Sequence, residues 1–239
     1  MPGVYRDVGI ALRTVKLGEA DRIVTFVTQG HGKVRAVAKG VRKTKSRFGA
    51  RVEPPTHVAL QLWEGRELDV VTSADALDHF KAVRTDLDRL TRATALLEAV
   101  DAVVQEREED PRIYAMLLGA LRVLSAQEAP LLVPAFYWKL LAQQGVGPVV
   151  DSCAHCGEAA ELVSFDVAEG GTLCRACRSG VRISPDAVRL LQRILGGELV
   201  AVLGEPASAA GFEVEALATT ALEAHLERRL RSVRLLDRH

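Results

Sequence analysis

The sequence predicts an α+β protein: a small N-terminal β barrel of five strands, then a helical domain into which a four-cysteine module is inserted. Three observations support this class. Short β-branched apolar runs with Gly and Pro turns fill the first eighty residues. Longer runs with a helical apolar period follow them. Four cysteines, arranged as two pairs, then interrupt the helical part.

The expected barrel occupies residues 1–80, because several short strand-like runs separated by turn residues are typical of a small barrel. The run at residues 23–27 is β-branched and aromatic, as strands prefer. The run at residues 33–39 alternates apolar and basic side chains, which predicts one buried and one positive face. The five expected strands are residues 8–15, 23–27, 33–39, 58–62 and 68–71.

A helical period begins after residue 76, and the expected helices are residues 87–104, 113–124, 132–141, 185–195 and 214–233. Ser184 followed by Pro185 is typical of an N-cap with proline at the first helical position. Pro134 is tolerated only in the first turn of its helix. We therefore expect a helical domain in two parts, residues 81–150 and 184–239, with the cysteine module at residues 151–183 between them.

The cysteines carry the strongest chemical signal in the chain. They are Cys153, Cys156, Cys174 and Cys177, so each pair has the C-x2-C spacing and seventeen residues separate the pairs. Two thiolates three positions apart can grip one metal ion through a tight turn, and a second pair completes the tetrahedron that structural zinc favours. Gly157 and Gly180 follow the two pairs, where backbone freedom helps a turn to close. We expect one structural Zn²⁺.

Other uses of four cysteines fit less well. Two disulfides need an oxidising compartment, and a redox motif needs only one C-x2-C pair. An iron–sulfur cluster can use four cysteines, but paired turns of this spacing favour zinc. His155 lies inside the first turn and could replace a cysteine, although a surface imidazole is the simpler interpretation. A shell closed by four thiolates leaves no position for water, so the site should be structural and not catalytic.

The N-terminus has no apolar segment like that of a signal peptide, and no apolar run approaches the length of a membrane span. We therefore expect a soluble cytoplasmic protein without membrane contact. The metal motif uses all four cysteines, which leaves no thiol for catalysis.

The formal net charge of zero hides a strong asymmetry along the chain. Residues 1–52 contain twelve Lys and Arg against three Asp and Glu, whereas residues 53–110 contain six against fourteen. No acidic residue occurs from Arg22 to Val52. A basic segment of this kind favours a polyanionic partner.

This basic segment predicts a DNA-binding surface on the barrel, because Lys and Arg neutralise phosphates and release counterions. Phe48 and His31 are candidates to stack on unpaired bases. The alternative is a solvated surface that serves solubility alone, but the lack of acidic residues favours binding. The candidate DNA-binding residues are Arg22, Lys33, Arg35, Lys39, Arg42, Lys43, Lys45, Arg47 and Arg51.

No catalytic motif accompanies this surface. The string Gly30-His31-Gly32-Lys33 is too short for a phosphate-binding P-loop, and neither G-x-S-x-G nor H-E-x-x-H occurs. The acidic residues 106–110 are a run and not a spaced cluster for two metal ions, and we interpret them as a solvated helix end. We therefore expect a protein that is not an enzyme.

Several strings resemble the RecO family of bacterial DNA repair proteins, and the resemblance continues over essentially the whole chain. The strings are Tyr5-Arg6-Asp7-Val8-Gly9-Ile10-Ala11-Leu12, Gly18-Glu19-Ala20-Asp21-Arg22-Ile23-Val24, Gly30-His31-Gly32-Lys33 and Ala38-Lys39-Gly40-Val41-Arg42-Lys43. The cysteine pairs and the Ser184-Pro185 helix start belong to the same likeness, and many but not all family members carry the cysteines.

The resemblance implies an oligonucleotide-binding (OB) barrel, and a recombination mediator that binds single- and double-stranded DNA and anneals complementary strands. It implies work with RecR to load RecA onto DNA coated by single-strand-binding protein (SSB), contact with the SSB C-terminal tail, and a cytoplasmic, nucleoid-associated protein. An alternative from the residues alone is a zinc-ribbon adaptor that binds RNA or protein partners. A metal-assisted nuclease lacks the ligands it would need.

Overall fold

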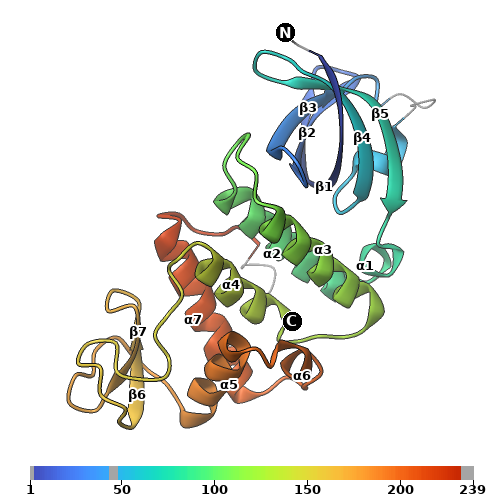
Figure 1. Cartoon of the computed structure of the whole chain (residues 1–239). Helices are drawn as coiled ribbons and strands as arrows, with labels where there is room; N and C mark the ends of the chain where they lie inside the picture. Colours follow the sequence, from blue (N-terminus) through green and yellow to red (C-terminus); the bar gives the residue numbers. More distant parts are fainter. Residues whose placement is uncertain (1–2, 43–47, 233–239) are drawn as a thin grey trace. The chain divides into compact units, whose positions relative to one another are not determined.

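The computed structural model describes residues 3–42 and 48–232, and the chain forms two compact units, one ending at Gln127 and the other beginning at Glu128. The first unit opens with five strands: β1 Val4–Leu17, β2 Asp21–Thr28, β3 Gly32–Ala38, β4 His57–Trp63 and β5 Asp69–Asp78. They close a barrel in the order β1-β2-β3-β5-β4 (Figure 1). A closed five-stranded barrel of this topology is of the OB type, which confirms the expected fold class.

Alternation along the strands builds the barrel core. Val34 and Ala36 of β3 point inward and pair with Phe26 and Val24 of β2, and all four side chains are fully buried. The core is therefore made mostly of small and β-branched residues, as a composition with 5% aromatics requires. The long strand β1 pairs with both β2 and β4, and this double pairing closes the barrel.

The first unit also contains the short helices η1 Gly49–Val52 and α1 Lys81–Thr85, and the longer helices α2 Leu87–Val103 and α3 Pro111–Ala126. Ile10 and Val27 lie on the outward face of the barrel and are nevertheless buried, because α2 and α3 pack over β1 and β2. A buried hydrogen bond of 2.8 Å joins His57 Nε2 of β4 to the Tyr114 hydroxyl of α3.

The acidic run at residues 106–110 is mostly exposed, as expected, but it does not end a helix, so that part of the interpretation was wrong. Helix α2 ends at Val103, and the loop that follows docks on the barrel, where Arg107 N donates to Lys33 O at 3.1 Å. Asp110 caps α3 by accepting hydrogen bonds from two backbone amides of its first turn, with proline at the first position. The Arg107 backbone therefore holds the loop to the barrel, and Asp110 begins the next helix.

The second unit consists of α4 Leu132–Gln143, a small sheet, and the helices α5 Pro185–Gly196, α6 Leu199–Leu203 and α7 Ala209–His225. The sheet has the order β7-β6-β8, with β6 Leu162–Asp166, β7 Gly171–Cys174 and β8 Val181–Arg182. Trp138 of α4 joins the parts, since its indole N–H donates to Val214 O at 3.3 Å and its ring meets Phe165 edge-on at 5.5 Å.

Local signals in this unit behave as expected, with one exception. Ser184 caps α5 by accepting a hydrogen bond from Ala187 N, and Pro134 lies in the first turn of α4. The last helix, however, was predicted to run over residues 214–233, whereas α7 begins earlier and ends at His225. Glu227 has a φ of 51°, which a helix cannot accommodate, and Val233 lies outside the described residues.

Of the helices in the described ranges, none combines the length and the apolar character that crossing a membrane requires. The division into four segments at residues 80, 150 and 183 stays a prediction.

The turn between β2 and β3 generates a stability prediction. Gly32 has a φ of +63°, and a Cβ there would lie 1.9 Å from Glu108 O, whereas Gly18 has a φ of +57° with open space around it. We expect Gly18→Ala to lower the free energy of unfolding by about 1 kcal/mol through backbone strain alone. Gly32→Ala should cost about 3 kcal/mol or more, because the docked loop must move as well. Urea unfolding of both variants checks this, and equal losses would contradict the docking.

Candidate metal centre and nucleic-acid interface

The four predicted cysteines converge at one point of the second unit. Their Sγ atoms all lie within 4.8 Å of one another, and Cys156 Sγ is 3.9 Å from Cys174 Sγ. This distance is far longer than the roughly 2.05 Å of a disulfide, and the four thiols are free. Four sulfur atoms so close together can hold a metal ion.

The first cysteine pair sits in a turn fixed by backbone hydrogen bonds. Gly157 N donates to Cys153 O at 2.8 Å, and Cys153 N donates to Glu158 O at 3.0 Å. Gly157 has a φ of +77° and Gly180 a φ of +68°, so both glycines adopt the left-handed conformation that the sequence suggested. The second pair is held by the hairpin, since Cys174 ends β7 opposite Leu162 of β6.

The electrostatics of the cluster suit a cation. Backbone N–H groups of Cys156 and Cys174 point at the Cys153 sulfur and lower the pKa of that thiol to about 6. Burial, together with hydrogen bonds to the neighbouring thiols, raises the pKa of Cys177 to about 12. Several thiolates crowded together repel one another, and a bound metal ion removes this penalty.

His155 pairs with a carboxylate and is not one of the clustered ligand residues. Its Nδ1 lies 3.0 Å from Glu169 Oε2, and the side chain is largely exposed. This carboxylate raises the pKa of His155, mainly through the hydrogen bond. The imidazole therefore behaves as a surface group beside the cysteines.

On the barrel, four of the nine candidate cations face acidic residues of the same unit. Lys33 Nζ donates to Asp101 O at 2.7 Å, and Arg35 lies 3.4 Å from Glu106. Arg22 pairs with Glu53 at 2.9 Å, and Arg51 lies 3.6 Å from Asp75. The positive face that alternation predicted along β3 therefore meets Asp101 at the end of α2 and Glu106 in the loop that follows it.

Two other candidates lie in the turn after β3. Lys39 is exposed, and the Arg42 guanidinium donates to Glu19 O at 2.9 Å in the turn between β1 and β2. Within residues 3–42 and 48–232, neither side chain has a carboxylate at ion-pair distance. Lys43, Lys45 and Arg47 lie outside the described residues.

The two proposed stacking residues differ in exposure. Phe48 is 8% exposed and packs in the barrel core, so its assignment as a stacking surface was wrong. His31 keeps a partly exposed side chain, but its ring lies 4.4 Å from that of Tyr5 and its Nδ1 lies 2.6 Å from Asp7.

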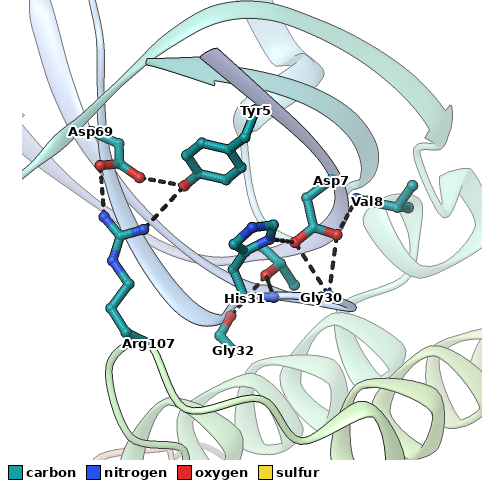
Figure 2. Close-up of polar contacts among 9 residues, drawn as sticks. Tyr5, Asp7, Val8, Gly30, His31, Gly32, Asp69 and Arg107 are labelled. Carbon is teal, nitrogen blue, oxygen red and sulfur yellow. Dashed lines mark hydrogen bonds and ion pairs between the residues drawn. The ribbon is translucent and has the colours of Figure 1, made fainter. Parts of the chain in front are cut away.

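A polar network around Tyr5 was not foreseen. Figure 2 shows the Tyr5 hydroxyl facing both Asp69 and Arg107, which also contact each other, with His31, Asp7 and Gly30 nearby. Asp69 is fully buried, accepts a hydrogen bond from the Tyr5 hydroxyl, and pairs with Arg107 at 2.6 Å. Burial, and then the bond to Asp69, raises the pKa of the Tyr5 phenol, which stays protonated. The network fixes the loop after α2 to the barrel, and three residues so far apart in sequence give no local signal.

Fold and site together define an OB-barrel protein whose second unit carries four clustered cysteines that can hold a metal ion. The chain belongs to the RecO family of DNA repair proteins: the family model described as "Recombination protein O N terminal" matches residues 1–80, and "Recombination protein O C terminal" matches residues 84–234.

Relatives of similar length support this membership. The chain is 44% identical over 241 residues to the DNA repair protein RecO of Frankia casuarinae, with 98% of this chain and 99% of the relative covered. It is also 44% identical to the DNA repair protein RecO of Thermobifida fusca, with 98% and 99% covered. The protein of the same name from Nocardioides sp. is 44% identical, with 98% and 100% covered.

The metal centre leads to a direct prediction. Cys174→Ser should abolish stoichiometric metal binding and lower the thermal stability of the second unit, because a structural ion held by the four thiolates would contribute to the folding of the hairpin. Metal analysis by mass spectrometry and thermal unfolding measure both effects. His155→Ala is the control and should retain the metal. Full metal content in Cys174→Ser would contradict the assignment.

Proposed function

We propose that this protein is a non-enzymatic recombination mediator that binds single- and double-stranded DNA, anneals complementary strands, and helps RecR to load RecA onto SSB-coated DNA. Membership of a DNA repair family supports the general role. The observation that carries the proposal is the basic turn at Lys39 and Arg42. Among the described residues, neither of these two side chains has a carboxylate at ion-pair distance.

The position of this turn suits a DNA contact. OB barrels bind oligonucleotides with the face of strands 2 and 3 and with the loop between strands 1 and 2. The Arg42 guanidinium donates hydrogen bonds to the backbone carbonyls of Gly18 and Glu19 in that loop. Gly40 N in the same turn donates to the Asp21 carboxylate at 2.7 Å. The sequence continues with Lys43, Lys45 and Arg47, which adds three cations to the same segment. We propose that these five cations provide most of the affinity.

Annealing needs no catalytic group. Two DNA strands repel through their phosphates, and a basic surface that contacts both lowers this repulsion without ATP. Flexible Lys and Arg contacts bind phosphates without reading base sequence, so the bases stay free to pair. No metal-ligating cluster other than the four cysteines is found among the residues that the structure describes. A closed thiolate shell does not activate water.

We propose that the ion is Zn²⁺ with a structural role. A tetrahedral Zn–thiolate site with bonds of about 2.3 Å has sulfur–sulfur edges of about 3.8 Å. The 3.9 Å between Cys156 and Cys174 agrees with this geometry. The ion would brace the hairpin that lies between α4 and α5 in the chain.

We also propose that the protein works in the cytoplasm on the nucleoid, and that the SSB C-terminal tail binds its helical part. A tail that ends in an apolar residue needs an apolar hollow. The second unit has one of about 450 Å³, lined by residues that include Trp138, Phe165 and Ala221.

Charge removal tests the DNA contact. The variant with Lys39, Arg42, Lys43, Lys45 and Arg47 replaced by Ala should bind oligonucleotides of every sequence at least 10-fold more weakly. Its salt slope should be flatter by about 0.7 for each phosphate of a single strand that the variant no longer neutralises. Fluorescence anisotropy at several salt concentrations measures both quantities.

A control variant with the same change of charge separates location from net charge. It replaces five exposed cations elsewhere, namely Arg6, Arg66, Lys81, Arg112 and Arg189. We expect a much smaller loss of affinity for this control. Equal losses, or unchanged binding in the first variant, would refute the assignment.

A strand-annealing assay separates the function classes. Complementary labelled strands should anneal faster with the protein, in EDTA applied briefly enough to leave the structural ion bound, and without ATP or magnesium. Binding to RNA alone would favour an adaptor protein instead. Strand cutting that depends on a divalent ion would favour a nuclease.

A further inference from the structure

The hairpin of the metal module carries a second basic surface, which the sequence analysis did not single out. Three arginines occur within eight residues around its second cysteine pair, at Arg175, Arg178 and Arg182. Together with Ser164, Ser179 and neighbouring backbone they line a cavity of about 540 Å³. The cavity belongs entirely to the second unit.

A buried hydroxyl in this cavity has no partner. Ser164 is 6% exposed, and among the described residues nothing donates to or accepts from its Oγ. A buried polar atom without a hydrogen bond costs roughly 1–3 kcal/mol. A bound acceptor at this position would remove that cost, so the orphaned hydroxyl itself points to a ligand.

The hairpin register explains why the serine and the arginines meet. Ser164 of β6 pairs directly with Arg182 of β8, so both side chains lie on one face of the small sheet. Gly180 makes this approach possible, because a Cβ there would lie 2.3 Å from Phe165 O. The segment that carries Arg178 is therefore held against β6 by the backbone.

Nearby acidic groups leave most of this positive charge uncompensated. Arg175 lies 3.1 Å from Glu161, but both side chains are highly exposed, and such pairs contribute little. Asp166 accepts hydrogen bonds from Ser179 Oγ and Ala168 N, which lower its pKa. Within residues 3–42 and 48–232, neither Arg178 nor Arg182 has a carboxylate at ion-pair distance.

We propose that this cavity binds the phosphodiester backbone of DNA, with the guanidinium groups of Arg178 and Arg182 on the phosphates and the Ser164 hydroxyl as an added donor. Arginine suits this role because its planar fork matches two phosphate oxygens. The cavity is larger than one phosphate needs and lies among exposed residues, which suits a chain of linked phosphates. The inference rests on the proposed DNA-binding function and gives the molecule a DNA contact separate from the barrel turn.

The test uses the full-length, metal-loaded protein and a single-stranded oligonucleotide, with affinity measured by anisotropy across salt concentrations. The double variant Arg178→Ala, Arg182→Ala should bind about 10-fold more weakly, with a salt slope flatter by about 1.4. Ser164→Ala should also weaken binding while the melting temperature stays equal or rises, because the variant removes an unpaired buried hydroxyl. A merely structural role for Ser164 would give the opposite result.

The control is the double variant Arg189→Ala, Arg228→Ala, which removes two exposed cations of the same unit. It should bind as the unaltered protein does. If the Arg178 and Arg182 variant matches this control, the second contact is refuted while the proposed function stands. If the unaltered protein does not bind DNA at low salt, both proposals fall.

Discussion

Packing of the helices against the barrel is the constraint on which the first unit depends, and Asp101 of α2 contributes two polar contacts to it. Its carboxylate binds Arg13 of β1 at 2.6 Å, and its backbone carbonyl accepts a hydrogen bond from Lys33 of β3. The Lys33 side chain is only 15% exposed, so without this partner its charge would be left poorly solvated. One acidic residue thus fastens two strands of the barrel to the helices, and the loop with Glu106 and Arg107 continues the same contact. Several basic side chains of the barrel are thus paired with acidic residues of the same unit.

The sequence predicted where the strands lie better than it predicted which residues pack against their outward faces. The alternation at residues 33–39 correctly indicates a strand with an apolar and a basic face, because a period of two is a local property. It cannot tell whether the basic face meets DNA or acidic residues of the same unit, since that depends on where Asp101 and Glu106 lie in the folded chain. The signal was present in the opposite charges of residues 1–52 and 53–110, which could also have been interpreted as complementary surfaces. Phe48 illustrates the same limit, because its basic neighbours suggest a loop although its ring packs in the core.

The cysteine module shows the reverse case, because the spacing of the cysteines correctly predicts that the four sulfur atoms come together. Two C-x2-C turns and glycines with positive φ bring the four sulfur atoms together as the sequence indicated. The arginine cavity on the same hairpin could not be found in this way. It depends on the pairing of Ser164 with Arg182, and a register between strands so short is not readable from composition. Likewise, the N-cap at Ser184 was predictable, whereas the end of α7 at His225 was not.

The double pairing of β1 has a consequence for how the chain is made on the ribosome. The barrel cannot close until β4 has been synthesised, because β1 needs β4 as its second neighbour. The outward apolar residues Ile10 and Val27 then wait for α3, which ends at Ala126. At a translation rate of about 5–20 residues per second, this apolar surface of the nascent chain stays exposed to solvent for several seconds. A chaperone that shields emerging apolar strands would therefore act on this protein mainly before its first unit is fully translated.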